Sequence, residues 1–283
     1  MVPTLVYDVF TDTPFAGNPL AVVPDATALD PALFLKVARE FNYSETTFVL
    51  PPDDPAHDAK VRIFTPTREL AFAGHPTIGT SLALHQLGRV GDTMVLELGV
   101  GPIPVTIDGT HAEFSTRVPL ETEPAASPTA LAACLGLEAA ALRTDRHAPI
   151  EAGLGTPFTL VELRDRASLD AASPNIDGFR AAATDPGRLA ILAYVRSGTS
   201  IEARMFAPLG GILEDPATGS AAAALAAYLG ELDGVSTRLD ISQGVKMGRP
   251  STITAGVTVK GGKSVEVTIA GSAVKVMEGA LTL

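Results

Sequence analysis

One short motif occurs twice in this chain of 283 residues, and its two copies lie almost half the chain length apart. The segment 62–66, Arg-Ile-Phe-Thr-Pro, is followed 142 positions later by Arg-Met-Phe-Ala-Pro at 204–208. A second match, Pro-Thr-Ile-Gly-Thr at 76–80 and Pro-Ala-Thr-Gly-Ser at 216–220, has a displacement of 140. A chain that repeats at half its length, and that is long enough for two domains, predicts two similar domains.

The composition changes between the two copies of the repeat. Residues 119–128 are rich in Glu, Thr, Pro, Ala and Ser, which is typical of a linker. We therefore predict an N-terminal domain over 1–118 and a C-terminal domain over 119–272. A last strand at about 273–283 could join the N-terminal domain.

Each half alternates strand-like runs with helical ones, which predicts a mixed α/β (α+β) fold. We expect helices at about 30–40, 77–87, 129–141, 174–183 and 220–229. We expect strands at about 5–10, 20–23, 46–50, 61–65, 93–98, 103–107, 111–116, 158–163, 189–195, 201–206, 237–242, 251–260, 264–269 and 273–277. The pair Gly261-Gly262 predicts a two-residue hairpin turn before the strand that starts near 264.

Charge and cysteine content exclude several classes of function. Against 21 Lys and Arg stand 32 Asp and Glu, and the net charge of −11 repels nucleic acid and anionic membrane surfaces. The single cysteine, Cys134, allows no internal disulfide and no two-cysteine site, and we expect a cytoplasmic protein. The five histidines never occur at metal-ligand spacing, so we expect no metal site.

Both copies of the second match predict the start of a helix, at Pro76 and at Pro216. A glycine early in a helix costs up to about 1 kcal/mol relative to alanine, so another role is expected for it. It could let an anionic ligand approach the unpaired N–H groups of the helix start. Alternatively, the glycines serve helix packing, Asp215 is an N-cap followed by proline, and His75 caps its own helix.

A glutamate stands among hydroxyl side chains at 42–48, Asn-Tyr-Ser-Glu-Thr-Thr-Phe. Glu45 is either a surface residue or a partly buried acid held by hydrogen bonds from hydroxyl groups. Burial raises the pKa of a carboxyl group from about 4.3 toward neutrality, which suits a group that takes up a proton and returns it.

Taken together, these motifs resemble those of the phenazine-biosynthesis PhzF family. The resemblance rests on the segments 8–11, 15–22, 42–48, 62–66, 73–77, 214–221, 243–244 and 247–251. It implies a diaminopimelate epimerase-like fold, in which two pseudo-symmetric α/β halves each wrap a strand-rich sheet around a central helix. It also implies an active site in the cleft between the halves and assembly as a homodimer.

The resemblance further implies a cofactor-independent isomerase. In epimerase relatives two cysteines start the central helices, but the matching positions here are Gly74 and Asp215, and Cys134 lies outside both motifs. Two-thiol racemisation is therefore excluded. Instead, the resemblance implies that Glu45 moves a proton between two carbons of a small, cyclic carboxylic acid, as in trans-2,3-dihydro-3-hydroxyanthranilate isomerisation.

The remaining site residues also come from the resemblance. His75 and Asp215 match positions that assist the proton movement or hold the substrate. The matching substrate-binding positions are Ser44, Gly74, Gly219 and Ser220. The alternative is a small-molecule-binding or protein-interaction protein that kept the fold and lost the chemistry, and the presence of Glu45, His75 and Asp215 argues against it.

Overall fold

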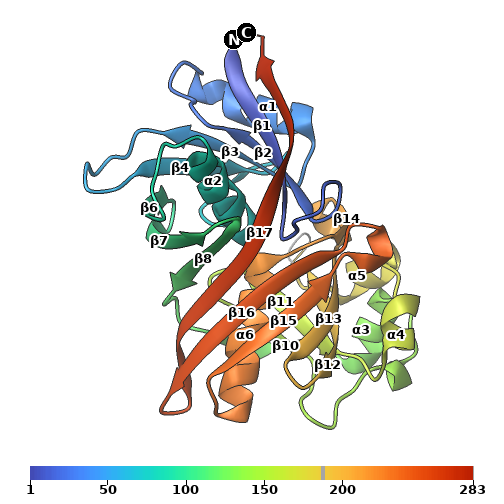
Figure 1. The fold of residues 1–283 in the computed structure, drawn as a ribbon. Helices are drawn as coiled ribbons and strands as arrows, with labels where there is room; N and C mark the ends of the chain where they lie inside the picture. Colours follow the sequence, from blue (N-terminus) through green and yellow to red (C-terminus); the bar gives the residue numbers. More distant parts are fainter. Residues whose placement is uncertain (186–188, 283) are drawn as a thin grey trace. The chain divides into compact units, whose positions relative to one another are not determined.

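The computed structural model describes residues 1–185 and 189–282 of the chain (Figure 1). The chain divides into two compact units. Unit 1 comprises Met1–Thr116 and Thr268–Leu283, and unit 2 comprises Arg117–Val267. The long strand β17 (Lys263–Leu281) crosses the second boundary, so unit 1 is built from two separate parts of the chain.

Unit 1 contains a strand-rich sheet that includes the second part of β17. Its other strands are β1 (Val2–Val9), β2 (Asn18–Val23), β3 (Glu45–Leu50), β4 (Ala59–Phe64), β5 (Glu69–Leu70), β6 (Thr93–Leu98), β7 (Gly101–Asp108) and β8 (His111–Thr116). The pairs β2–β3 and β4–β6 are parallel, whereas β1–β2, β3–β4, β4–β5, β6–β7 and β7–β8 are antiparallel. Because β17 pairs with both β1 and β8, the strands surround the interior of the unit.

The interior of unit 1 is filled by α2 (Gly74–Gln86), which contacts β1, β2, β3 and β8. Residues on all sides of this helix are buried, as expected for a helix enclosed by a sheet. A second helix, α1 (Phe34–Phe41), follows a short 3₁₀ turn and packs against β3 and β4. There the Phe34 and Phe48 rings stack with centroids 4.2 Å apart, and Phe64 meets both edge-on.

Unit 2 repeats this plan. Its strands are β9 (Glu121–Pro124), β10 (Ile150–Gly153), β11 (Pro157–Glu162), β12 (Ile191–Ser197), β13 (Ser200–Ala207), β14 (Ile212–Asp215), β15 (Thr237–Gln243) and β16 (Ser251–Lys260), followed by the start of β17. The parallel pairs β11–β12 and β13–β15 correspond to β2–β3 and β4–β6 of unit 1. The antiparallel pairs β10–β11, β12–β13, β13–β14 and β15–β16 also have their counterparts there.

The central helix of unit 2 is α6 (Gly219–Asp233), which contacts β10, β11, β15 and β16. The outer helices are α3 (Pro128–Cys134), α4 (Arg166–Ala171) and α5 (Ile176–Ala182), and short 3₁₀ turns lie at Ala139–Ala141, Pro208–Gly210 and Val245–Met247. An apolar cluster that includes Cys134, Phe179 and Phe206 joins these outer helices to the sheet.

The repeated Arg-x-Phe motif has the same structural role in both units. Arg62 in β4 binds both carboxylate oxygens of Glu69, at 2.7 Å each. In unit 2, Arg204 in β13 binds both oxygens of Glu214, at 2.8 Å each, and its guanidinium lies over the Phe206 ring. The motif therefore fastens a long strand to the short strand that follows it.

Several expected elements differ from the observed ones. The helix expected over 129–141 stops at Cys134, because Gly136 adopts a left-handed conformation with φ of 65°. The expected linker contains β9, which pairs with β10. The strands expected at 264–269 and 273–277 are one continuous strand. Gly271 lies within it, and a glycine is needed there because a Cβ would lie 2.3 Å from the Phe10 ring.

No helix within the described residues has both the length and the apolar character needed to cross a membrane.

Candidate active site

The candidate residues of unit 1, Ser44, Glu45, Gly74 and His75, are called the first half-site. Ser44 and Glu45 lie where α1 turns back into β3. Asn42 ends the helix in a left-handed conformation with φ of 54°, and its N–H donates to the carbonyl of Ala38. Two residues later the Ser44 hydroxyl donates to Oδ1 of Asn18, at 3.1 Å. Glu45 then opens β3 beside β2, so its backbone is fixed by the sheet.

Glu45 meets His75 of the central helix α2. Glu45 Oε2 and His75 Nε2 are 3.5 Å apart, and the two side chains are 14% and 5% exposed. Burial lowers the pKa of His75 to about 3, so the imidazole is neutral near pH 7 and the contact is not an ion pair. His75 Nε2 is buried and makes no hydrogen bond, although a carboxyl oxygen lies close by.

Two hydroxyl groups around Glu45 have hydrogen-bond partners on neighbouring elements. Ser44 binds Asn18, and the Thr47 hydroxyl lies 2.9 Å from that of Thr80 on α2. The Thr46 hydroxyl is buried and has no hydrogen-bond partner. These contacts hold β3 against β2 and α2.

The second half-site lies between β14 and α6. Asp215 is the last residue of β14 and is only 6% exposed. The Thr218 hydroxyl donates to Asp215 Oδ2 at 2.5 Å. Thr218 is the N-cap residue and α6 begins at Gly219, so the alternative in which Asp215 caps a helix starting at Pro216 is wrong.

A loop after β15 holds this half-site in place. The Gln243 side chain is buried and donates to the carbonyl of Asp215 and to the Thr218 hydroxyl, at 2.8 and 3.0 Å. Gly244 follows with φ of 74°, and a Cβ there would lie 2.6 Å from the carbonyl oxygen of Pro216. Sequence reasoning did not select Thr218 or Gln243 as site residues, although both belong to segments that carry the family resemblance.

The two central helices begin without a side-chain cap. The N-cap residues Ala73 of α2 and Thr218 of α6 make no side-chain hydrogen bond to their helices. By contrast, the outer helices α3, α4 and α5 are capped by Ser127, Asp165 and Asn175. Uncapped first-turn N–H groups are suited to binding an anion.

The glycines of the two helix starts differ in role. Gly74 and Gly219 are the first residues of α2 and α6, and both are buried. Gly79, which the Pro-x-x-Gly match aligns with Gly219, lies within α2 and serves packing: a Cβ there would meet Leu20 at 2.6 Å and Val9 at 2.7 Å. His75 is the second residue of α2 and does not cap it, and the expected helix start at Pro76 is wrong.

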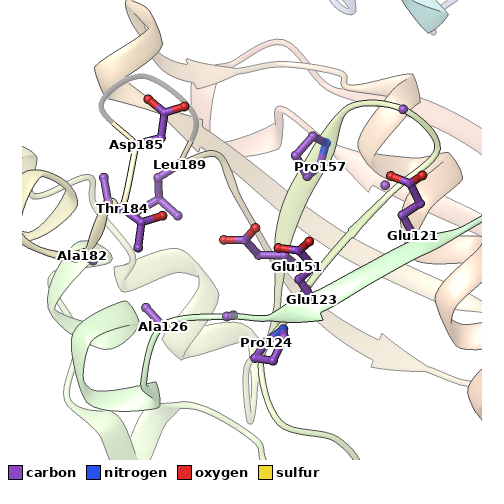
Figure 2. A pocket seen from close by; sticks show the side chains of 14 residues that line it. Glu121, Glu123, Pro124, Ala126, Glu151, Pro157, Ala182, Thr184, Asp185 and Leu189 are labelled. Atoms are coloured by element: carbon purple, nitrogen blue, oxygen red, sulfur yellow. The ribbon is translucent and has the colours of Figure 1, made fainter.

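A cavity of about 510 Å³ in unit 2 has different chemistry (Figure 2). Carboxylate side chains line it, with Glu123 directly opposite Glu151 on the paired strands β9 and β10. No Lys or Arg is found among its described lining residues, and none of the candidate site residues lines it. Its charge would repel a carboxylic acid.

Known proteins are similar to this chain in sequence and in fold. The family model of the phenazine biosynthesis-like protein PhzC-PhzF matches residues 7–279. An uncharacterized isomerase of Mesorhizobium japonicum is 41% identical and matches 98% of this chain and 97% of its own. A trans-2,3-dihydro-3-hydroxyanthranilate isomerase of Pseudomonas aeruginosa is 36% identical, with 97% of each chain covered.

The fold agrees with this relationship. The crystal structure of a PhzF-family phenazine biosynthesis protein of Bacillus anthracis matches with a TM-score of 0.89 and 25% identity, over 100% of this chain and 99% of that one. The protein is thus an isomerase with the mixed α/β, epimerase-like fold that the sequence predicts. It belongs to the phenazine biosynthesis-like PhzF family.

Proposed function

We propose that this isomerase moves a proton between two carbon atoms of a small, cyclic, unsaturated carboxylic acid, and that Glu45 carries the proton. The observation that supports this role is the 3.5 Å approach of the Glu45 carboxyl to the buried, neutral His75. A carboxyl group sheltered from water can take a proton from one carbon and return it to another. The named activity of the Pseudomonas aeruginosa relative supports the substrate class.

His75 assists this transfer without becoming charged. A neutral imidazole has one nitrogen that donates and one that accepts. Because burial keeps the pKa of His75 near 3, the ring can hold the Glu45 carboxyl or a polar group of the substrate while the proton moves.

The substrate carboxylate binds backbone N–H groups in this proposal. The first turns of α2 and α6 supply them, at Gly74 and at Gly219 and Ser220, and neither turn is capped by a side chain. Ser44, held by Asn18, adds a hydroxyl group beside Glu45. Local helix dipoles thus offset a net charge of −11 that would otherwise disfavour an anionic substrate.

Asp215 is the second acid–base group in the proposal. Its burial and its hydrogen bond from Thr218 fix its carboxyl group, as a group that exchanges protons with a bound ring requires. The proposed transfer uses carboxyl groups, an imidazole and backbone amides alone.

Solvent-deuterium exchange on a panel of cyclic unsaturated carboxylic acids, trans-2,3-dihydro-3-hydroxyanthranilate included, tests the proposal. The wild-type protein is expected to isomerise a member of the panel and to place deuterium on one of its carbons. The variant Glu45→Gln should lower kcat by about 10²- to 10⁴-fold and leave KM nearly unchanged, since the amide cannot carry a proton.

The matched control is Glu40→Gln, at an exposed position of α1, which should behave as wild type. Full activity of Glu45→Gln would overturn the role of Glu45. A product formed by water addition would overturn the reaction class. Binding of the acids without any turnover would favour the protein that kept the fold and lost the chemistry.

A further inference from the structure

Thr218 occupies an N-cap position but does not act as a cap. Threonine is favoured at N-caps because its hydroxyl accepts from an N–H of the first helical turn. Here the hydroxyl is turned instead toward the Asp215 carboxyl, at 2.5 Å from Oδ2. The Thr218 hydroxyl thus does not cap α6, and a buried acid gains a hydrogen bond from it.

The direction of this hydrogen bond is set by Gln243. The backbone N–H of Thr218 can only donate, so the atom of the Gln243 amide that faces it, at 3.3 Å, must be the oxygen Oε1. The nitrogen Nε2 therefore faces the Thr218 hydroxyl, at 3.0 Å, and the carbonyl of Asp215, at 2.8 Å. An NH₂ group only donates, so the Thr218 oxygen accepts from it and directs its own hydrogen to Asp215.

Gln243 cannot easily adopt another arrangement. Its side chain is buried, with the whole residue 1% exposed, and the next residue, Gly244, touches the backbone of the loop that follows β14. The carbonyl of Gly244 also accepts the N–H of Arg249, which closes the loop on itself. The Gln243 amide thereby links two segments of unit 2 that are distant in sequence.

We propose that Gln243 is a positioning residue of the isomerase. It fixes the Thr218 hydroxyl as a donor to Asp215, and Thr218 in turn holds the Asp215 carboxyl in the orientation used for proton transfer. This inference rests on the acid–base role proposed for Asp215. It adds two residues, Thr218 and Gln243, that touch no substrate and act through Asp215.

The variant Gln243→Glu reverses the polarity of the contact at nearly constant shape. In its ionised form, the side chain that it introduces has two oxygens that accept hydrogen bonds, and neither of them donates. The Thr218 hydrogen would then turn toward position 243 and away from Asp215. The variant Thr218→Val removes the hydroxyl, and Thr218→Ser restores it without the methyl group.

The first experiment observes the hydroxyl proton directly by NMR and needs no substrate. In the wild type, the Thr218 hydroxyl proton is expected to exchange slowly, to resonate downfield and to show a nuclear Overhauser effect to the Gln243 side-chain amide. Thr218→Ser should keep this signal and Gln243→Glu should lose or shift it. An unchanged signal in Gln243→Glu would overturn the orienting role.

The second experiment measures kcat and KM with the acid that the deuterium-exchange panel identifies. Thr218→Val and Gln243→Glu should lower kcat by about 10- to 100-fold, the loss expected for one hydrogen bond to a charged group, with KM nearly unchanged. Thr218→Ser should recover most of kcat.

Two matched controls should equal wild type. Thr159→Val changes a buried threonine of β11 that lies outside both half-sites. Gln86→Glu changes an exposed glutamine of α2, whose side-chain oxygen accepts from the Tyr7 hydroxyl, and a carboxylate can accept the same hydrogen bond.

Two failures can be told apart. If Glu45→Gln is inactive while Thr218→Val and Gln243→Glu keep wild-type kcat, the positioning role is wrong and the proposed function stands. If Glu45→Gln keeps full activity, the proposed function itself fails. A fall in Tm of both variants, with kcat per folded molecule unchanged, would show a merely structural role and overturn the inference.

Discussion

His75 is a titratable side chain placed where its charged form is strongly disfavoured. It is 4% exposed as a whole residue, lies in the first turn of α2, and has a pKa lowered to about 3 by burial. Water is the usual partner of a protonated imidazole, and burial removes it. Folding therefore selects the neutral form throughout the physiological range of pH.

This selection predicts how stability depends on pH. Between the unfolded pKa of about 6.5 and the folded pKa of about 3, the unfolded state binds a proton at His75 that the folded state does not. The free energy of unfolding should therefore fall as pH is lowered from about 6.5 toward 3, by up to about 1.4 kcal/mol per pH unit from this residue. Urea denaturation at a series of pH values measures the slope.

The variant His75→Gln should lack this component of the slope. His85→Gln is the control, because the His85 side chain is more exposed, at 27%, and contacts Asp92 at the surface. Equal slopes in the wild type and His75→Gln would contradict the burial of a neutral imidazole.

At the scale of single residues, the sequence motifs identified the candidate residues but not the contacts that these residues make. Nothing in the sequence shows that Glu45 and His75, thirty positions apart, come within 3.5 Å. Gln243 was visible only as part of a motif, because its role depends on a loop that returns to Asp215 from another strand. Side-chain contacts of this kind are made by tertiary packing, which local patterns do not encode.

The two copies of the Arg-x-Phe motif differ in how deeply their Arg–Glu ion pairs are buried. In unit 1 the side chains of Arg62 and Glu69 are 29% and 42% exposed. In unit 2 those of Arg204 and Glu214 are 9% and 15% exposed. Arg204 also donates to the carbonyl oxygens of Leu169 and Ala172, so more groups depend on it.

We therefore expect unequal effects of the same substitution. Arg204→Ala should lower the free energy of unfolding by about 3–5 kcal/mol, because it leaves a buried carboxylate and buried carbonyls without their partner. Arg62→Ala should cost only about 1–2 kcal/mol, from a partly exposed ion pair and lost contacts with the Phe34 and Phe64 rings. Denaturant titrations of both variants measure the difference, and equal losses would contradict the dependence on burial.

Sequence patterns predicted most elements but placed some boundaries wrongly. The strand repeat was detectable because Arg and Phe have fixed positions near the ends of β4 and β13, and a proline follows each strand. The helix starts were less regular: Pro76 lies inside α2, whereas Pro216 precedes the N-cap of α6. Proline is compatible with both places because neither requires its missing N–H, so its position alone does not fix a helix start.

At the scale of the whole molecule, each unit has its own central helix and its own enclosing sheet. The fold class was predictable from the alternation of patterns, the internal repeat and the family resemblance. The continuity of the last strand, expected as two strands over 264–269 and 273–277, was not. Gly271 lies between the two expected strands, and only the position of the Phe10 ring, 2.3 Å from a Cβ placed at 271, shows why a glycine stands within one continuous strand there.

Cys134 offers a measure of the integrity of unit 2. It is the last residue of α3 and is fully buried in the apolar cluster of unit 2, and burial raises the pKa of its thiol to about 11. We expect the native protein to resist a thiol reagent such as dithionitrobenzoate at pH 8 and to react once unit 2 unfolds. Labelling followed across a urea titration should coincide with the loss of circular dichroism, and rapid labelling without urea would contradict this prediction.

Because of strand β17, the two units become complete at different times during translation. All residues of unit 2 leave the ribosome before 268–282, which unit 1 needs to cover the edges of β1 and β8. The part of the protein that is translated first is thus completed last, and its two unpaired strand edges are open to other chains while translation continues. The N-terminal half is therefore prone to aggregation for the time that residues 117–267 take to be translated.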